Sequence, residues 1–119
     1  MSQIVDWLLK QHQQIMDCEQ TALDMLAKDD IAGYREKMRE KAELLASLAE
    51  RARPELEGLP ETSRRTVEAG LQQFSASAET ALSLDSLFYK SALLYRDDHK
   101  RGEPDNLEIF IQAIRQKLA

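Results

Sequence analysis

The sequence is poor in the residues that interrupt secondary structure or most often carry out chemistry. Its 119 residues include four glycines, three prolines, two histidines and a single cysteine. So few glycines and prolines leave few places for turns, which favours long helices over many short strands. Cys18 has no second cysteine to pair with in this chain, so an internal disulfide is excluded, as is usual in a reducing compartment. We therefore expect a cytoplasmic protein.

Positive charge and long apolar runs are also scarce. Sixteen basic residues stand against 21 acidic ones, which gives a net charge of -5. The basic residues Arg51, Arg53, Arg64 and Arg65 gather near one turn, but glutamates are interleaved with them and no aromatic residue accompanies them, so we expect no nucleic-acid partner. No apolar run approaches the roughly 20 residues of a membrane span, and the N-terminus lacks a basic leader, so we expect neither a membrane span nor a signal peptide.

The segment 22–48 organises the rest of the chain. Apolar residues recur at helical spacing up to Lys28, two aspartates follow, and a second amphipathic run starts at Ile31. Asp29 or Asp30 can cap the second helix, because a carboxylate accepts the free backbone N–H groups of a first helical turn. So short a connection forces the two helices to lie antiparallel. The segment therefore predicts a helical hairpin that the rest of the chain must cover.

The same periodicity predicts helices over 3–28, 31–53, 60–99 and 105–118. Pro54 cannot lie inside a helix without removing a backbone hydrogen bond, so 54–60 is predicted to be a connection. A polar break is expected over 96–104, and Asp105 or Asn106 is expected to cap the last helix. The predicted fold is all-α, an antiparallel bundle of three long helices plus a short C-terminal helix, in one domain over residues 1–119.

The pattern also predicts which faces are buried. On the first helix, a second apolar row that contains Leu9, Leu23 and Leu26 widens the stripe, and Cys18 on the main seam is interpreted as an inert core residue. On the second helix, Lys41 belongs to the charged face opposite the stripe, so we expect it to face solvent.

Candidate catalytic and metal-binding residues are few. With only His12 and His99, the ligands of a hemerythrin-type iron site are missing, and the Glu-x-x-His pairs of ferritin-like sites do not occur. Asp97, Asp98 and His99 are adjacent, so on a helix they would point in different directions, and we interpret them as a polar helix end. Four scattered glycines form no phosphate-binding loop. We therefore predict no catalytic residue, no metal site and no cofactor, and a protein that is not an enzyme.

A four-helix domain also invites comparison with histidine phosphotransfer domains, in which an apolar residue and Lys-Gly follow the histidine. His12 is followed by Gln-Gln-Ile and His99 by Lys-Arg-Gly, so neither matches. A phosphorelay-type four-helix domain is kept as a weak alternative.

What remains is apolar surface beyond the needs of a simple hairpin. After Leu84 large apolar residues surround most of the predicted third helix, and the last helix carries one apolar face. Core packing is the competing interpretation, but such faces can also hold a helix of another protein or a second copy in a structural homodimer. The predicted protein-binding residues are Phe88, Tyr95, Leu107, Phe110, Ile111, Ile114 and Leu118.

The hairpin carries a family resemblance. A leucine-rich end over 23–26 leads into Lys28, Asp29, Asp30 and Ile31, and a charged helix follows with Lys41, Leu44, Leu45 and Leu48. In this order and in overall length, the chain resembles the flagellar type III export chaperones of the FlgN and FliT kind. The resemblance implies a cytoplasmic, non-enzymatic chaperone that binds a terminal helical segment of a secreted client. It also implies that the C-terminal helix can cover the client surface, with 102–104 as a hinge.

Overall fold

The computed structural model describes residues 3–118, and every regular element in that range is a helix. The elements are α1 (Gln3–Ala27), α2 (Ile31–Ala46), α3 (Leu48–Ala52), the 3₁₀ helix η1 (Arg53–Leu56), α4 (Glu61–Ser83), α5 (Leu87–Ala92) and α6 (Asn106–Leu118). The predicted all-α bundle is confirmed.

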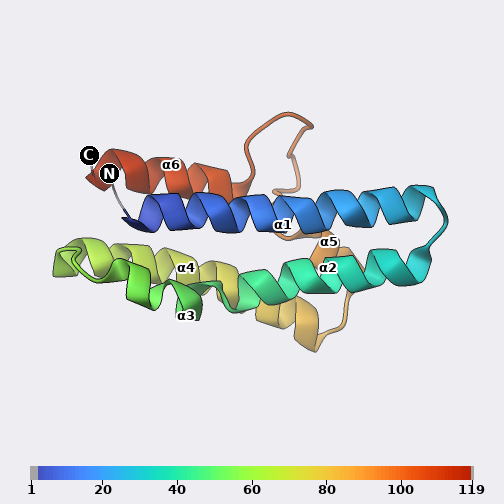
Figure 1. Cartoon of the computed structure of the whole chain (residues 1–119), viewed down its shortest axis with the longest axis horizontal. Coiled ribbons are helices and arrows are strands. Elements are labelled where there is room, and N and C mark those ends of the chain that lie inside the picture. Colours follow the sequence, from blue (N-terminus) through green and yellow to red (C-terminus); the bar gives the residue numbers. More distant parts are fainter. Residues whose placement is uncertain (1–2, 119) are drawn as a thin grey trace.

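The bundle is elongated, about 48 × 29 × 23 Å. Figure 1 shows α1 and α2 side by side and antiparallel, with α4 packed along α2 and α3. The chain then returns through α5 and a long loop to α6, which runs antiparallel to α1 and ends near the start of α1. Among residues 3–118, no helix combines the length and the apolar character needed to cross a membrane.

The predicted hairpin turn is confirmed. Asp30 is the N-cap of α2, and its Oδ1 accepts a hydrogen bond from the backbone N–H of Gly33 at 2.9 Å. Asp29 adopts a positive φ of 63°, which aspartate tolerates better than most residues. A Cβ at Gly33 would lie 2.5 Å from the Asp30 carboxylate and from the sulfur of Met25, so a larger residue there would displace these two side chains.

The second predicted helix is interrupted, which corrects the expected range 31–53. The hydroxyl of Ser75 on α4 donates to Leu45 O at 2.9 Å and accepts from Ala49 N at 3.1 Å. In an unbroken helix the N–H of Ala49 would donate directly to Leu45 O. The inserted hydroxyl therefore separates α2 from α3 at Ser47, as side chains that enter a helical hydrogen-bond ladder commonly do.

The third predicted helix is also shorter than expected, which corrects the range 60–99. It ends at Ser83, and Asp85 has a φ of 48° that no helix can continue. Ser86 then caps α5, its Oγ accepting from Tyr89 N at 3.2 Å. After α5, the loop 93–105 leads to α6, and Leu94 within this loop has a φ of 77°.

The core follows the predicted stripes in most places but not in all. Lys41 was predicted to face solvent, yet its side chain is 0% exposed. Leu9, Leu23 and Leu26 were predicted to be buried, yet all three are exposed, and Cys18 is only half-buried. One stripe is therefore enough to hold α1 against its neighbours. The buried apolar residues include Ile4, Leu8, Ile15, Leu45, Leu48, Leu56, Leu71 and Leu107.

Candidate functional site

The most exposed apolar side chains lie where α4 passes into α5. Leu84 is 60% exposed, Phe88 74% and Tyr89 51%. The rings of Phe88 and Tyr89 meet edge to face with centroids 5.7 Å apart. We call these three residues the α5 corner. Asp85 borders them and accepts a hydrogen bond from Lys90 Nζ at 2.7 Å, so the corner has a charged neighbour on one side.

The predicted binding residues of α6 lie mainly in the interior. Leu107, Ile111 and Ile114 are buried in the core shared by α1, α4 and α6. Phe110 is half-buried and packs edge to face on Phe74 with centroids 5.4 Å apart. Leu118 is half-buried at the end of the helix. The described conformation therefore leaves α6 no broad apolar face for a client, in contrast to Phe88.

A groove of about 950 Å³ lies at the end of the bundle, between the start of α1, the connection from η1 to α4 and the end of α6. Leu118 lines it together with Val5 and Leu59, and Arg115 and Glu57 lie at its sides. Its mixed apolar, polar and charged lining distinguishes it from the α5 corner, which consists of one leucine and two aromatic residues.

Tyr95 belongs to a buried polar network rather than to a free surface. Its hydroxyl donates to Glu19 Oε1 at 2.6 Å, and its ring lies 5.1 Å from Lys41 Nζ. Lys41 Nζ lies 3.5 Å from Glu19 Oε2 and donates to Ser91 O at 3.2 Å. Burial, followed by the bond to Glu19, raises the pKa of Tyr95, and burial lowers the pKa of Lys41. The network joins α1, α2, the last turn of α5 at Ser91 and Tyr95 in the loop that follows it.

A second polar cluster joins α1 to the start of α6. His12 Nε2 lies 2.7 Å from Asp105 Oδ2 and 3.9 Å from Glu108 Oε1. Asp105 and Glu108 also form a capping box, since Glu108 N donates to Asp105 Oδ1 at 2.8 Å and Asp105 N donates to Glu108 Oε1 at 3.0 Å. The hydrogen bond to Asp105 raises the pKa of His12, although burial opposes it. Burial would raise the pKa of Asp105, but the hydrogen bonds from His12 and from backbone N–H groups outweigh it and lower the pKa.

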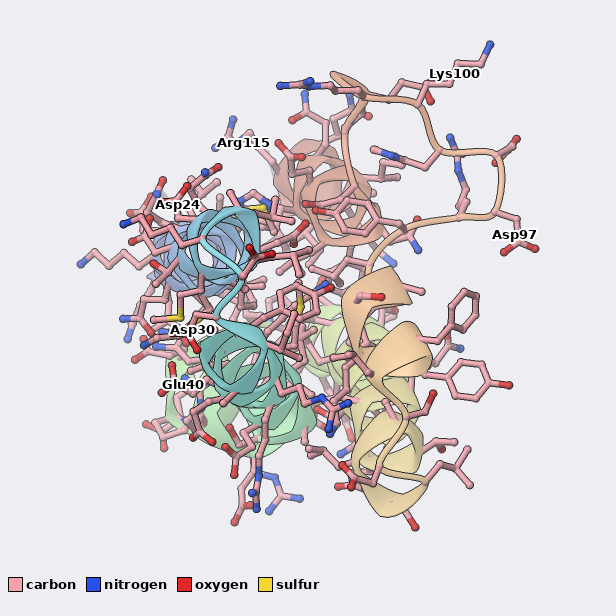
Figure 2. All side chains as sticks on the ribbon, turned by 90° about the vertical axis from the view of Figure 1, so that its right-hand side faces the viewer. Asp24, Asp30, Glu40, Asp97, Lys100 and Arg115 are labelled. Carbon is pink, nitrogen blue, oxygen red and sulfur yellow. The ribbon has the colours of Figure 1, made fainter. Side chains whose placement is uncertain are left out.

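Asp97, Asp98 and His99, interpreted from the sequence as a polar helix end, lie instead in the loop 93–105. Figure 2 shows Asp97 and Lys100 at the outer edge of the loop, away from the helices. His99 lies against the Tyr95 ring, 4.9 Å between centroids, and its Nε2 is 2.9 Å from Glu103 O. Within residues 3–118, the group with metal-ligand spacing is instead His12, Asp105 and Glu108, whose ligand atoms all lie within 4.8 Å of one another.

Sequence reasoning missed this cluster because His12 and Asp105 are 93 residues apart. One local signal was present, since the Asp-x-x-Glu spacing of Asp105 and Glu108 predicts a capping box whose carboxylates face the same way. The expected helix cap at Asp105 is confirmed. The position of His12 beside it depends on how α6 packs on α1.

A scan against models of protein families, a search of curated proteins and a search of solved structures each returned no match. The class of the protein is therefore defined by its fold, an all-α helical bundle.

Proposed function

We propose that the protein is a non-enzymatic, helical protein-binding module whose α5 corner contacts a helical segment of another protein. The observation that carries the proposal is the exposure of Leu84, Phe88 and Tyr89 at one short turn of the chain. Single exposed apolar residues are ordinary on protein surfaces, but a contiguous group suits an interface. Burial of each side chain against a partner would contribute about 1.5–3 kcal/mol.

The corner has the composition of a recognition surface for an amphipathic helix. Aromatic side chains are enriched at the centres of interfaces, and charged residues are typical of their rims. Here Phe88 and Tyr89 supply the aromatic pair, and the exposed carboxylate of Asp85, which is bonded to the buried Lys90, supplies a charged border. A helix laid against this corner would bury its apolar stripe on the rings and keep its polar face in water.

The resemblance of 22–48 to flagellar type III export chaperones supports a particular partner class. We therefore propose that the partner is a helical segment of a secreted client, which the protein holds in the cytoplasm before export. The predicted client surface is the α5 corner rather than α6, because Leu107, Ile111 and Ile114 are occupied by the chain's own core.

The test uses a photo-crosslinking amino acid placed at position 88 in cells of the source organism, with position 31 as the matched control. Ile31 is also exposed but lies at the hairpin turn. We expect a secreted protein to be captured from position 88 and not from position 31. With the purified partner, Phe88→Ser should lower affinity about 30-fold or more, the loss expected of an interface residue worth 2 kcal/mol.

Two results would contradict the proposal. Unchanged affinity in Phe88→Ser would show that the α5 corner is not the binding surface. A partner that is never exported would contradict the proposed role as an export chaperone. To separate lost binding from lost folding, the unfolding midpoint of Phe88→Ser is compared with that of the parent chain. At so exposed a position, the free energy of unfolding is expected to change by less than about 0.5 kcal/mol.

The second candidate is a structural homodimer that uses the same corner. The edge-to-face pair of Phe88 and Tyr89 could meet its own copy across a two-fold axis, because such interfaces are self-complementary. Sedimentation at several concentrations distinguishes the two functions. A dimer that Phe88→Ser dissociates favours the homodimer, and a monomer at all concentrations eliminates it.

A further inference from the structure

The cluster of His12, Asp105 and Glu108 is composed of groups that ligate metal ions. The three side chains converge from two elements, since His12 lies on α1 and the carboxylates lie at the start of α6. Asp105 is buried, His12 is largely buried and Glu108 is exposed. The cluster therefore has a protected inner side and an outer side that faces solvent.

The capping box leaves these carboxylates able to bind a cation. It engages Oδ1 of Asp105 and Oε1 of Glu108 with backbone N–H groups, whereas Oδ2 of Asp105 points to His12 Nε2. Backbone bonds of this kind fix the orientation of ligating carboxylates in metal sites. Oδ2 of Asp105 is outside the capping box, and Oε1 of Glu108 keeps a second lone pair for a metal ion while it accepts from Asp105 N.

The ligand atoms are already close to the spacing that a small divalent ion needs. Bonds of 2.0–2.2 Å in tetrahedral geometry place neighbouring ligand atoms about 3.3 Å apart. The distances from His12 Nε2 to Asp105 Oδ2 and to Glu108 Oε1 are 2.7 Å and 3.9 Å, one below that value and one above it. Both distances therefore lie within about 0.6 Å of the spacing that the ion needs.

Space for further ligands lies beside the cluster. A cavity of about 440 Å³ is bordered by Asp105, Glu108, Met16 and Tyr95, with the loop 99–103 over its outer part. Two of the three proposed ligands, Asp105 and Glu108, line this cavity, which matches an open site in which water or a small molecule completes the coordination. A closed structural site would need a fourth protein ligand.

The local charge gives an independent reason to expect a cation. Three carboxylates, from Glu19, Asp105 and Glu108, act on His12 electrostatically, and Lys41 supplies one positive charge against them. With His12 neutral, these four charged groups leave two negative charges in excess. Glu19 Oε2 is buried, and Lys41 Nζ lies 3.5 Å from it. A helix cap alone explains the backbone bonds, but it does not offset this charge.

We propose that the protein binds one divalent transition-metal ion of the zinc class through His12 Nε2 and one oxygen each of Asp105 and Glu108. One imidazole and two carboxylates form a mixed nitrogen and oxygen set of the kind that zinc and its neighbours accept. Bound there, the ion joins α1 to the first turn of α6 and presents its open positions to the cavity. The proposal uses no residue of the α5 corner, so it stands or falls separately from the proposed function.

The test titrates chelator-treated full-length protein with Co²⁺, whose visible absorption reports coordination by protein ligands. We expect one Co²⁺ per chain, displaced by Zn²⁺. Glu108→Gln keeps a residue that can complete the capping box, so folding is preserved while a ligand is lost. This variant and His12→Gln should each weaken Co²⁺ binding at least about tenfold.

Two control variants sharpen the result. His99→Gln removes the only other histidine, and Cys18→Ser removes the only thiol, and both should bind Co²⁺ as the parent chain does. Circular dichroism must show the same helical content in all variants. Absence of saturable binding, binding unchanged in both His12→Gln and Glu108→Gln, or binding lost in His99→Gln would each overturn the proposal.

Discussion

Replacing Ile111 by alanine tests whether α6 is part of the core or a separable cover. Ile111 is 2% exposed and belongs to the apolar cluster that α1, α4 and α6 share. Ile109 provides the matched control, because it lies two residues away on the same helix and is 42% exposed. The two substitutions remove the same atoms and change helix propensity alike, so the difference between them isolates packing.

The expected magnitude follows from burial. Truncation of a fully buried isoleucine to alanine costs about 2–5 kcal/mol, through lost transfer free energy and the cavity left behind. Truncation at the half-exposed Ile109 should cost less than about 1 kcal/mol. A domain of this length has a total free energy of unfolding of roughly 6–18 kcal/mol, so Ile111→Ala removes a large share of it.

Urea titration measures the difference, with circular dichroism reporting helix and Trp7 fluorescence reporting the packed end of α1. Trp7 is a suitable probe because it packs against the core, with the Arg51 guanidinium 5.6 Å from its ring. For a urea dependence of about 1–3 kcal/mol per molar, a loss of 3 kcal/mol lowers the midpoint by about 1–3 M. A single transition is expected by both probes.

Two outcomes would refute the reasoning. The first is an Ile111→Ala midpoint no lower than that of Ile109→Ala. The second is a separate early transition that loses only the helical signal of α6 and leaves Trp7 fluorescence unchanged, because that would show a helix that detaches from an otherwise folded bundle.

Two further predictions concern α4 and α1. In the same titration, Ser75→Ala should lower the free energy of unfolding by about 1–3 kcal/mol, because Leu45 O and Ala49 N both lose their buried partner. Ser77→Ala on the exposed face should change it little. Equal effects would contradict the role assigned to the Ser75 hydroxyl. Cys18 should be alkylated by iodoacetamide with a pH midpoint above 9.0, because burial and then the Glu40 carboxylate raise the pKa of the thiol. Glu40→Gln should lower that midpoint, and a midpoint at or below 9.0 in the parent chain would show the raised pKa to be wrong.

The parts of the fold that could be predicted are those whose causes are local in sequence. The hairpin turn depends on Asp29, which adopts a positive φ, and on Asp30, which caps the helix beside it, and the cap of α6 depends on Asp105. The end of α4 also had a local signal that the apolar periodicity concealed. Ser86 is a good N-cap, and Asp85 before it tolerates a positive φ, so Asp-Ser could have been recognised as a helix boundary.

The parts that could not be predicted depend on distant residues. The break between α2 and α3 is made by Ser75, which is 30 residues from Leu45 and 26 from Ala49. Lys41 occupies a position that the pattern assigns to solvent, but Ser91 in α5 and Tyr95 in the following loop, at least 50 residues further along the chain, pack against it. Periodicity along one helix cannot show what a later segment will cover.

The same comparison applies to the candidate site. Phe88 could be identified from an excess of apolar residues around one stretch, and the structure places it on the surface. Leu107, Ile111 and Ile114 have the same apolar character but are buried in the core. Sequence identifies apolar residues, whereas only packing decides which of them remain exposed to a partner.

The buried polar contacts explain how the segment after α5 is held. The chain from Leu93 to Asp105 has little helical periodicity, so an apolar stripe cannot position it. The last turn of α5 and this loop are instead bound to the hairpin at three points, where Lys41 bonds Ser91, Tyr95 bonds Glu19 and Asp105 bonds His12. Buried charged pairs contribute little net stability, but they are satisfied in only one arrangement of their partners. The polar side chains of α1 and α2 therefore fix where α5 ends and where α6 begins. The exposure of the α5 corner and the burial of α6 both depend on that arrangement.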